Sequence, residues 1–347
     1  MLDDTHVLKK VFKLSRAHAA AQKLQSSYCY PLLRHRRNRP NDKSSILIPA
    51  KGTYYAYPTW YCVPTFAKDA SGTSGGTLQG RITCKKPSAQ TFPPTSKFCI
   101  QWRFPKGSIL GFDLSQVELR VAALLSGDPA LLRAYLDGDD LHKQRAIQIF
   151  GSDIEGRTDY RDLRQAGKMI NFADLFRSGS NTMQQQLLAM TGQLHPIEFF
   201  KKVSSSRPVH RPGLWAWQEE RIAEARSRGY VSLPFTGQSR YFLGGDKWDV
   251  NEIVNFPVQT TAGNTLLRIQ HYVSKSIGSI NARKPMAYMM LNIYDAVYID
   301  CHPSAIEMVE DAVRMAVEWV QDHEYWAKLQ YLYGREVPLE YDLEKVG

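Results

Sequence analysis

Two aspartates stand where a carboxylate could bind a divalent cation. Asp113 follows an apolar run from residue 108 that reads as a buried strand, and Asp295 interrupts a second apolar region, 287–300, as the turn of a hairpin would. If the sheet brings the two acids together, their oxygen atoms would hold two Mg²⁺ ions about 3.5–4 Å apart, as in-line phosphoryl transfer requires. For either aspartate alone, a turn or cap role is the commoner one.

A second set of residues would line one face of a helix between the two acids. Its members recur every fourth residue, cationic at one end and aromatic at the other: Arg164, Lys168, Phe172 and Phe176. The cationic end suits a triphosphate and the aromatic end a base and sugar. His142, just after an acidic loop, would add a hydrogen-bond donor for the phosphates. The alternative interpretation is a solvated basic stripe with two core aromatics.

The elements around these residues predict an α+β fold with a discontinuous sheet. Strands are expected at 108–114 and 287–300, separated by a long, mainly helical insertion at 130–228. A helix is expected over 1–25 and an irregular, turn-rich stretch over 26–106. Shorter elements are expected as helices at 119–125, 215–228, 251–276 and 303–321, and as a hairpin at 230–243.

Composition limits the class of protein. The 347 residues carry a net charge of +10, most of it within the first 51 residues, which indicates either a polyanionic partner or a solvated basic arm. Five cysteines without a CxxC pair argue against a zinc ribbon and a secreted disulfide scaffold. No signal peptide and no apolar run of about 18 residues is found. We therefore expect no secretion, no membrane and a cytoplasmic location.

Three segments carry a resemblance to a known family. Residues 113–120 read DLSQVELR and resemble the first signature of family A (DNA polymerase I-like) DNA polymerases, and the similarity continues through 125–129, 138–142 and 150–151. Residues 164–176 resemble the family's nucleotide-binding helix. Residues 291–297 read LNIYDAV and resemble its metal-binding hairpin, although Tyr294 and Ala296 replace the usual His and Glu around the aspartate.

This resemblance, over roughly residues 20–325, implies a right-hand polymerase with an antiparallel palm sheet, a helical fingers insertion and a truncated or missing thumb. The implied division is a basic arm or thumb remnant at 1–50, palm at 51–127, fingers at 128–245 and palm again at 246–347. The short stretch before Arg81 leads us to expect no proofreading exonuclease on this chain. A phage-type or split polymerase fits this pattern, with a second polypeptide supplying thumb, exonuclease or both, in the cytoplasm of a bacterial or virus-infected cell.

The resemblance also implies roles for individual residues. Two Mg²⁺ ions, or Mn²⁺ in their place, would be held by Asp113, the Leu114 carbonyl and Asp295, and Lys168 would protonate the pyrophosphate. Glu118 would occupy the space of a 2′-hydroxyl and so favour deoxynucleotides. The implied dNTP contacts are Arg164, Lys168, His142, Phe172, Gln116, Glu118 and Phe176. Two further segments resemble the family's primer–template-binding stretches, residues 80–93 and residues 255–259, which read NFPVQ. The implied primer–template contacts are Arg81, Gln90, Asn255, Gln259 and Tyr294.

The function implied is template-directed 5′→3′ synthesis of DNA from dNTPs on a primed template. One alternative is a non-catalytic or weakened primer–template-binding subunit of a split polymerase that needs a partner chain, and Tyr294 and Ala296 motivate it. A reverse transcriptase or RNA polymerase activity in the same fold is the other, and Glu118 argues against the use of ribonucleotides.

Overall fold

The structure is a computed structural model. It describes residues 100–242 and 250–346 continuously, with parts of 14–22, 47–61 and 77–92. Most of the helix expected over 1–25, and most of the basic arm, lie outside the described residues. The chain forms two compact units, one of residues 1–113, 272–313 and 342–347, the other of residues 114–271 and 314–341. The four-part division expected from the sequence stays a prediction.

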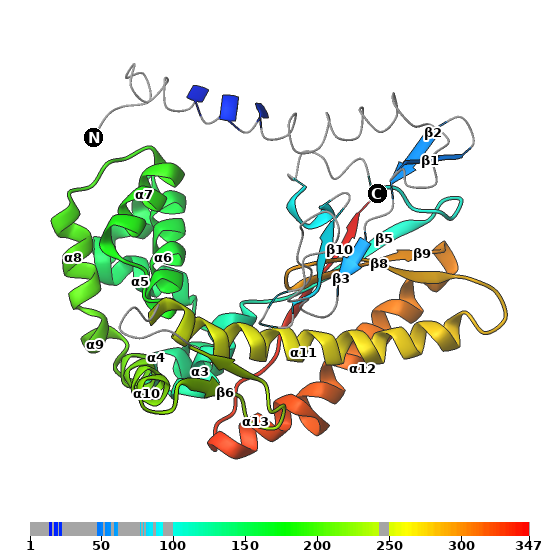
Figure 1. The fold of residues 1–347 in the computed structure, drawn as a ribbon. Helices are drawn as coiled ribbons and strands as arrows, with labels where there is room; N and C mark the ends of the chain where they lie inside the picture. The colour runs from blue at the N-terminus through cyan, green and yellow to red at the C-terminus, as the bar shows by residue number, and fades with distance from the viewer. Residues whose placement is uncertain are drawn as a thin grey trace. The chain divides into compact units, whose positions relative to one another are not determined.

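A four-stranded sheet is the centre of the first unit (Figure 1). Its strands lie in the order β10–β5–β9–β8, and β9 is antiparallel to both β5 and β8. The strands span Ser108–Leu114 (β5), Ala287–Ile293 (β8), Ala296–Cys301 (β9) and Tyr341–Val346 (β10). The predicted strand and hairpin are thus confirmed. They could be predicted because an apolar run bounded by turn residues is a strong local signal.

Short strands correct the expectation of an irregular stretch at 26–106. They form two antiparallel two-stranded sheets. One pairs β1 (Leu47–Ala50) with β2 (Thr53–Ala56), and the other pairs β3 (Thr59–Tyr61) with β4 (Thr83–Lys85). Each has three or four residues, too few to show a periodic pattern among glycines and prolines, although their threonines, tyrosines and tryptophan favour strands. A 3₁₀ turn, η2 (Ala89–Thr91), follows β4.

The second unit is mainly helical, as the sequence predicts. Its helices are α3 (Val117–Ser126), α4 (Pro129–Asp137), α5 (Leu141–Phe150), α6 (Tyr160–Leu175), α7 (Ser180–Thr191), α8 (Ile197–Ser205), α9 (Arg207–His210) and α10 (Pro212–Arg228), with the 3₁₀ turn η4 (Ser152–Gly156) before α6. Gly127 ends α3 in the left-handed conformation and the Asp128 carboxylate caps α4.

The remaining elements follow the predicted pattern, except for a helix at Tyr325–Tyr333 that was not expected. Strands β6 (Tyr230–Ser232) and β7 (Ser239–Tyr241) form the expected hairpin after α10. Two long helices, α11 (Val250–Ile280) and α12 (Ile306–His323), contribute residues to both units, and α13 (Tyr325–Tyr333) follows. A 3₁₀ turn, η5 (Pro303–Ala305), precedes α12. Among the described residues, no helix is both long and apolar enough to cross a membrane.

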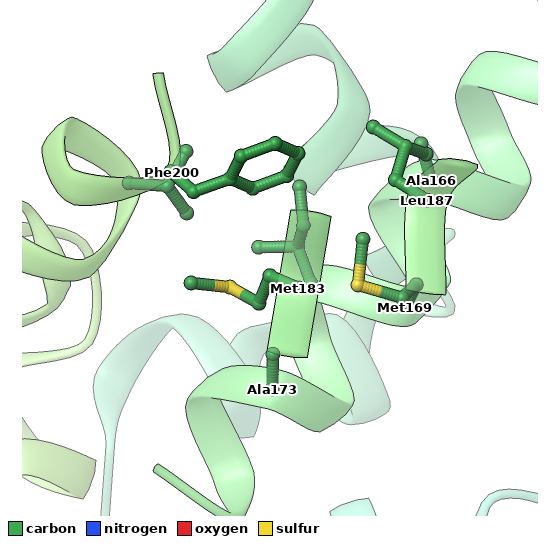
Figure 2. Close-up of a cluster of buried hydrophobic side chains, with 8 residues drawn as sticks. Ala166, Met169, Ala173, Met183, Leu187 and Phe200 are labelled. Carbon is green, nitrogen blue, oxygen red and sulfur yellow. The ribbon is translucent and has the colours of Figure 1, made fainter. Parts of the chain in front are cut away.

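Helix α6 is held by an apolar cluster on one of its faces. Figure 2 shows side chains of α6 and α7 meeting Phe200 of α8, and the buried cluster comprises Ala166, Met169, Ile170, Ala173, Met183, Leu187, Phe200 and Val203. The α6 members recur at spacings of three and four, which places them along one side of the helix. The cluster therefore fixes the rotation of α6 about its axis.

Gly167 permits a close contact between α5 and α6. A Cβ at this position would lie 2.2 Å from the His142 carbonyl oxygen and 2.9 Å from the Ala146 nitrogen, both backbone atoms. Changing Gly167 to alanine should therefore force the helices apart and lower the free energy of unfolding by about 1–3 kcal/mol, measured by urea denaturation. Gly278→Ala is the matched control, because this exposed helical position has open space and alanine should stabilise it by up to about 1 kcal/mol. Equal stabilisation of both variants would contradict the predicted clash.

Candidate active site

The sheet register brings the two predicted acids together. Strand β5 pairs with β9 so that Asp113 lies opposite Ala296, the residue that follows Asp295. Residues directly opposite in an antiparallel pair have Cα atoms about 4.5–5.5 Å apart. Asp113 is also the exposed residue of an otherwise buried strand. Two carboxylates therefore meet at one end of the sheet, within a single unit of the chain.

The turn that carries Asp295 is a two-residue loop. Ile293 pairs with Ala296, which leaves Tyr294 and Asp295 as the connecting residues. Tyr294 has a φ of 56°, a left-handed conformation that costs a residue with a Cβ roughly 1–2 kcal/mol. The ladder of β8 and β9 therefore overrides the preference of the tyrosine. The result holds Asp295 partly buried and leaves Tyr294 exposed.

Arg81 is the cationic neighbour of Asp295. Its Nη2 lies 3.3 Å from the Asp295 Oδ1. Burial raises the pKa of Asp295, and the charge and hydrogen bond of Arg81 partly oppose this effect. A half-buried carboxylate of this kind is stabilised by cations, so the site suits a metal ion as well as a guanidinium.

The donor set of this region fits magnesium better than zinc. No cluster of three or more His, Cys, Asp or Glu residues that could hold a metal occurs in the part of the chain that the structure describes. Two aspartates and the Leu114 carbonyl at the end of β5 offer only hard oxygen atoms. Mg²⁺ is usually bound in proteins through one or two carboxylates and keeps several waters. The residues present are therefore compatible with the predicted cations.

Gln90, a predicted primer–template contact, has an internal role in the structure. Its Nε2 donates to the carbonyl oxygens of Ile82 and Asn292, at 2.8 and 2.9 Å, and its Oε1 accepts from the Cys84 backbone at 3.1 Å. These bonds connect the segment around β4 to β8. A direct contact with DNA through this amide would have to replace some of them.

The predicted face of α6 is present in the helical unit. Arg164 donates from Nε to the Asp140 Oδ2 at 2.6 Å, and Lys168 is exposed one turn further along. Phe172 and Phe176 follow, both partly buried, with ring centroids 6.3 Å apart. One side of this helix is thus cationic at its start and aromatic at its end.

Asp140 connects α6 to the start of α5. Desolvation alone would raise the pKa of Asp140, but the hydrogen bond from Arg164 and the backbone N–H groups of Lys143 and His142 lower it overall. The same carboxylate caps α5. Asp140 is therefore ionised at neutral pH, and it fixes both Arg164 and the first turn of the helix that carries His142.

His142 is buried and uncharged. Its ring centroid lies 6.5 Å from that of Phe172. Burial, followed by the positive charges of Lys168 and Arg164, lowers the pKa of His142 to about 4, although Asp140 acts in the opposite direction. At neutral pH the imidazole can therefore donate a hydrogen bond but adds no charge, and Arg164 and Lys168 supply the cations.

The lowered pKa of His142 predicts an acid-dependent loss of stability. As pH falls from 6.5 towards 4, the unfolded chain takes up this proton before the folded protein does, so the contribution is complete above pH 6.5 and is lost near pH 4. A shift of this size corresponds to at most about 3 kcal/mol. Urea unfolding at pH 7 and pH 4.5 should show a smaller pH dependence in His142→Gln than in the wild type. The pKa of Asp140 is lowered from 3.8, so its own contribution is lost only below this range. Equal pH dependence in both proteins would contradict the expectation.

The other predicted contacts lie on well-defined elements. Gln116 precedes α3 with a φ of 53°, and Glu118 is in the first turn of that helix. Asn255 and Gln259 are four apart on α11, and the Asn255 Oδ1 is buried without a hydrogen-bond partner in the described residues. Within the first unit the structure brings together Asp113, Asp295, Arg81 and Tyr294. Within the second it brings together Arg164, Lys168, His142, Phe172 and Phe176.

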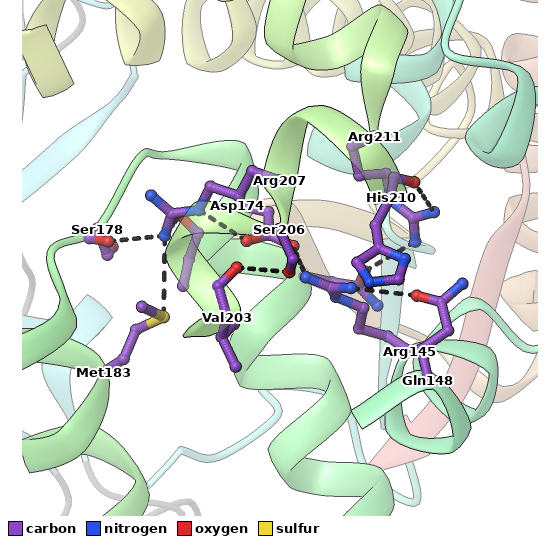
Figure 3. A network of polar contacts seen from close by, with 12 residues as sticks. Arg145, Gln148, Asp174, Ser178, Met183, Val203, Ser206, Arg207, His210 and Arg211 are labelled. Atoms are coloured by element: carbon purple, nitrogen blue, oxygen red, sulfur yellow. Dashed lines mark hydrogen bonds and ion pairs between the residues drawn. The ribbon is translucent and has the colours of Figure 1, made fainter. Parts of the chain in front are cut away.

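A buried ionic network that was not predicted from the sequence joins α6 to its neighbours (Figure 3). The Asp174 carboxylate accepts from the Arg145 Nη2 at 2.7 Å and from the Arg207 Nε at 2.9 Å, and all three side chains are buried. It connects α5, α6 and α9. The available signal was Asp174 itself, a carboxylate on the apolar face of the expected helix, whereas the spacing of the two arginines gives no indication of their pairing.

Comparison with known proteins identifies the family. The family model for DNA polymerase family A matches residues 2–345, and the chain belongs to this family. It is 28% identical over 254 residues to the thermostable DNA polymerase I of Thermus caldophilus, which covers 70% of this chain and 29% of that protein. It is 24% identical over 288 residues to DNA polymerase I of Rhizobium leguminosarum, which covers 77% of this chain and 28% of that one. The matched part is thus less than a third of the length of these relatives.

A solved structure shows the same fold. The POL domain of Pol1 from M. smegmatis, in complex with DNA primer–template and dNTP, aligns with a TM-score of 0.68 over 99% of this chain and 55% of that chain, at 20% sequence identity. The family predicted from residues 113–120, 164–176 and 291–297 is therefore confirmed, together with the mixed helical and antiparallel-sheet architecture.

Proposed function

We propose that the chain catalyses template-directed 5′→3′ DNA synthesis, with transfer of a nucleotidyl group from a dNTP to a primer 3′-hydroxyl. The observation that carries this proposal is the register of β5 and β9, which brings Asp113 and Asp295 together in a chain that belongs to DNA polymerase family A. In this proposal the four-stranded sheet is the palm, and the helices within 128–245 are the fingers.

Asp113, the Leu114 carbonyl and Asp295 would hold two Mg²⁺ ions, and Mn²⁺ could replace them. When bound, the cations would lower the pKa of the primer hydroxyl and stabilise the charge that develops on the phosphates. The protein's own contribution is to fix the two carboxylates on adjacent strands. Arg81, which pairs with Asp295, would keep this carboxylate ionised and contact the primer end.

The α6 face would bind the nucleotide. Arg164 and Lys168 would contact the triphosphate, with Lys168 placed to protonate the departing pyrophosphate. Neutral His142 would donate a hydrogen bond to the same phosphates. Phe172 would stack on the incoming nucleotide, and Phe176 would help to position the template base. Exposed Lys168 has no hydrogen bond or ion pair within the described residues, so it is available for this role.

Sugar selection and duplex binding complete the proposal. Glu118 would exclude a 2′-hydroxyl, and Gln116 would lie beside the nucleotide. Asn255, Gln259 and Tyr294 would contact the primer–template, as would Gln90 if its internal hydrogen bonds are exchanged. The Oδ1 of Asn255 is buried and has no hydrogen-bond partner within the described residues, so it can still accept a hydrogen bond.

Primer extension by the purified chain tests the proposal. Labelled primed DNA, the four dNTPs and Mg²⁺ at low salt should give extended products. Chelation with EDTA should abolish extension, and restoring Mg²⁺ or Mn²⁺ should recover it. Extension that survives complete chelation would contradict the metal-dependent chemistry.

A second candidate is a primer–template-binding subunit with weak or no catalysis. Tyr294 and Ala296, which stand beside Asp295 in place of the family's usual residues, favour it. Gel-shift binding of primed DNA without extension, under conditions in which a known polymerase extends the same primer, would support this candidate. Extension restored by a second polypeptide would identify a split enzyme.

A further inference from the structure

The side-chain amide of Asn171 is fixed in one orientation. Asn171 lies on α6 and is 2% exposed. Its Oδ1 accepts from the Arg211 Nη2 at 3.1 Å, and its Nδ2 donates to the Leu141 carbonyl oxygen at 3.0 Å. A guanidinium can only donate and a carbonyl can only accept, so both ends of the amide are determined independently.

The orientation of the amide determines the tautomer of His142. The Asn171 Nδ2 lies 3.2 Å from the His142 Nδ1. Since this amide nitrogen carries hydrogens, Nδ1 must accept, and a neutral imidazole then has its single proton on Nε2. The doubly protonated ring is disfavoured by burial and by the nearby charges of Lys168 and Arg164, and Asp140 is the charged group that opposes them.

The His142 Nε2 remains available. It makes no hydrogen bond within the part of the chain that the structure describes, and it is not completely buried. Its N–H can therefore reach solvent or a ligand. Arg164 and Lys168, the cations that act on this ring, are the same residues that define the proposed phosphate site.

We propose that Asn171, held by Arg211, is a positioning residue that keeps His142 in its Nε2–H tautomer and so presents a neutral hydrogen-bond donor to a nucleotide phosphate. The assignment of the phosphate rests on the proposed function. The connection runs from Arg211, which precedes α10 and is labelled beside His210 in Figure 3, through α6 to the first turn of α5. Arg211 is itself buried, and a fixed donor of this kind restricts the amide more than water would.

The tautomer is measured directly by NMR. Long-range ¹H–¹⁵N spectra of the full chain labelled with ¹⁵N-histidine distinguish the two neutral tautomers and the imidazolium, and His142→Gln identifies the signal of this residue. We expect the Nε2–H tautomer at pH 7. The Nδ1–H tautomer or an imidazolium in the wild type would overturn the proposal. Because this measurement needs no DNA synthesis, its outcome is separate from that of the proposed function.

Asn171→Asp tests the positioning role. A carboxylate facing Nδ1 can only accept, so we expect the single His142 proton to move to Nδ1, which leaves Nε2 without a hydrogen to donate. The dNTP dissociation constant should rise about tenfold, the effect of one lost hydrogen bond to a charged group. Asn181→Asp, an exposed amide-to-acid change on α7, is the matched control and should alter neither signal nor affinity. An unchanged tautomer in folded Asn171→Asp would overturn the proposal, and the wild-type spectrum decides it if this variant does not fold.

Discussion

Asp113→Asn or Asp295→Asn is expected to lower the rate of primer extension by at least about a thousandfold. This corresponds to a rise of about 4 kcal/mol in activation free energy. The register of β5 and β9 brings the two carboxylates together, and an amide at either position would bind a divalent cation far less well. Single-turnover extension, with DNA binding measured in parallel, separates chemistry from affinity. Primed-DNA affinity should change little.

Asp300→Asn is the matched control on β9, the strand that follows Asp295 and pairs with β5. Asp300 is buried in β9 and accepts from the Arg103 Nε at 2.8 Å, away from the turn at Tyr294 and Asp295. Its substitution should reduce stability but leave extension intact at temperatures where the variant is folded. Extension by Asp113→Asn or Asp295→Asn within tenfold of the wild type would rule out the paired carboxylates as the catalytic centre.

Asp174→Ala is expected to cost about 3–5 kcal/mol of unfolding free energy, because it leaves Arg145 and Arg207 buried without their counter-charge. Their two guanidinium groups share one carboxylate in a region from which water is largely excluded. Urea denaturation of the wild type and the variant measures the difference. A loss below about 1 kcal/mol would show that the network contributes little net stability.

The matched control for this second prediction is Glu318→Ala. Glu318 pairs with Arg314 four residues earlier on α12, and both side chains are about half exposed. Such surface pairs contribute about 0.5 kcal/mol or less. The contrast between the two variants isolates burial as the cause, because each removes one carboxylate from an arginine.

The features predicted well from the sequence are those with strong local patterns. The strand ending at Asp113, the hairpin around Asp295 and the helix ending at Gly229 combine apolar periodicity with turn or cap residues, and all three are observed. The four-residue spacing from Arg164 to Phe176 likewise predicted a single helix face. These signals depend on neighbours in the chain, so they are visible before the fold is known.

The features that were missed depend on contacts between distant segments. The pairing of Asp174 with two arginines, and of Asn171 with Arg211, joins residues 29 or more positions apart and leaves no periodic trace. The close approach at Gly167 was also missed, although a glycine inside a strong helical pattern often marks such a contact. The register that places Asp113 opposite Ala296 could be obtained only from the folded sheet.

Single-nucleotide incorporation on four primed templates, identical except for the templating base, tests the central claim most directly. A DNA polymerase with its acids at Asp113 and Asp295 should add the complementary dNTP on each template in the presence of Mg²⁺. Glu118 should make it prefer each dNTP over the matching ribonucleotide. Tight binding of all four templates without incorporation, or incorporation that ignores the templating base, would contradict the claim that this chain is a template-directed DNA polymerase.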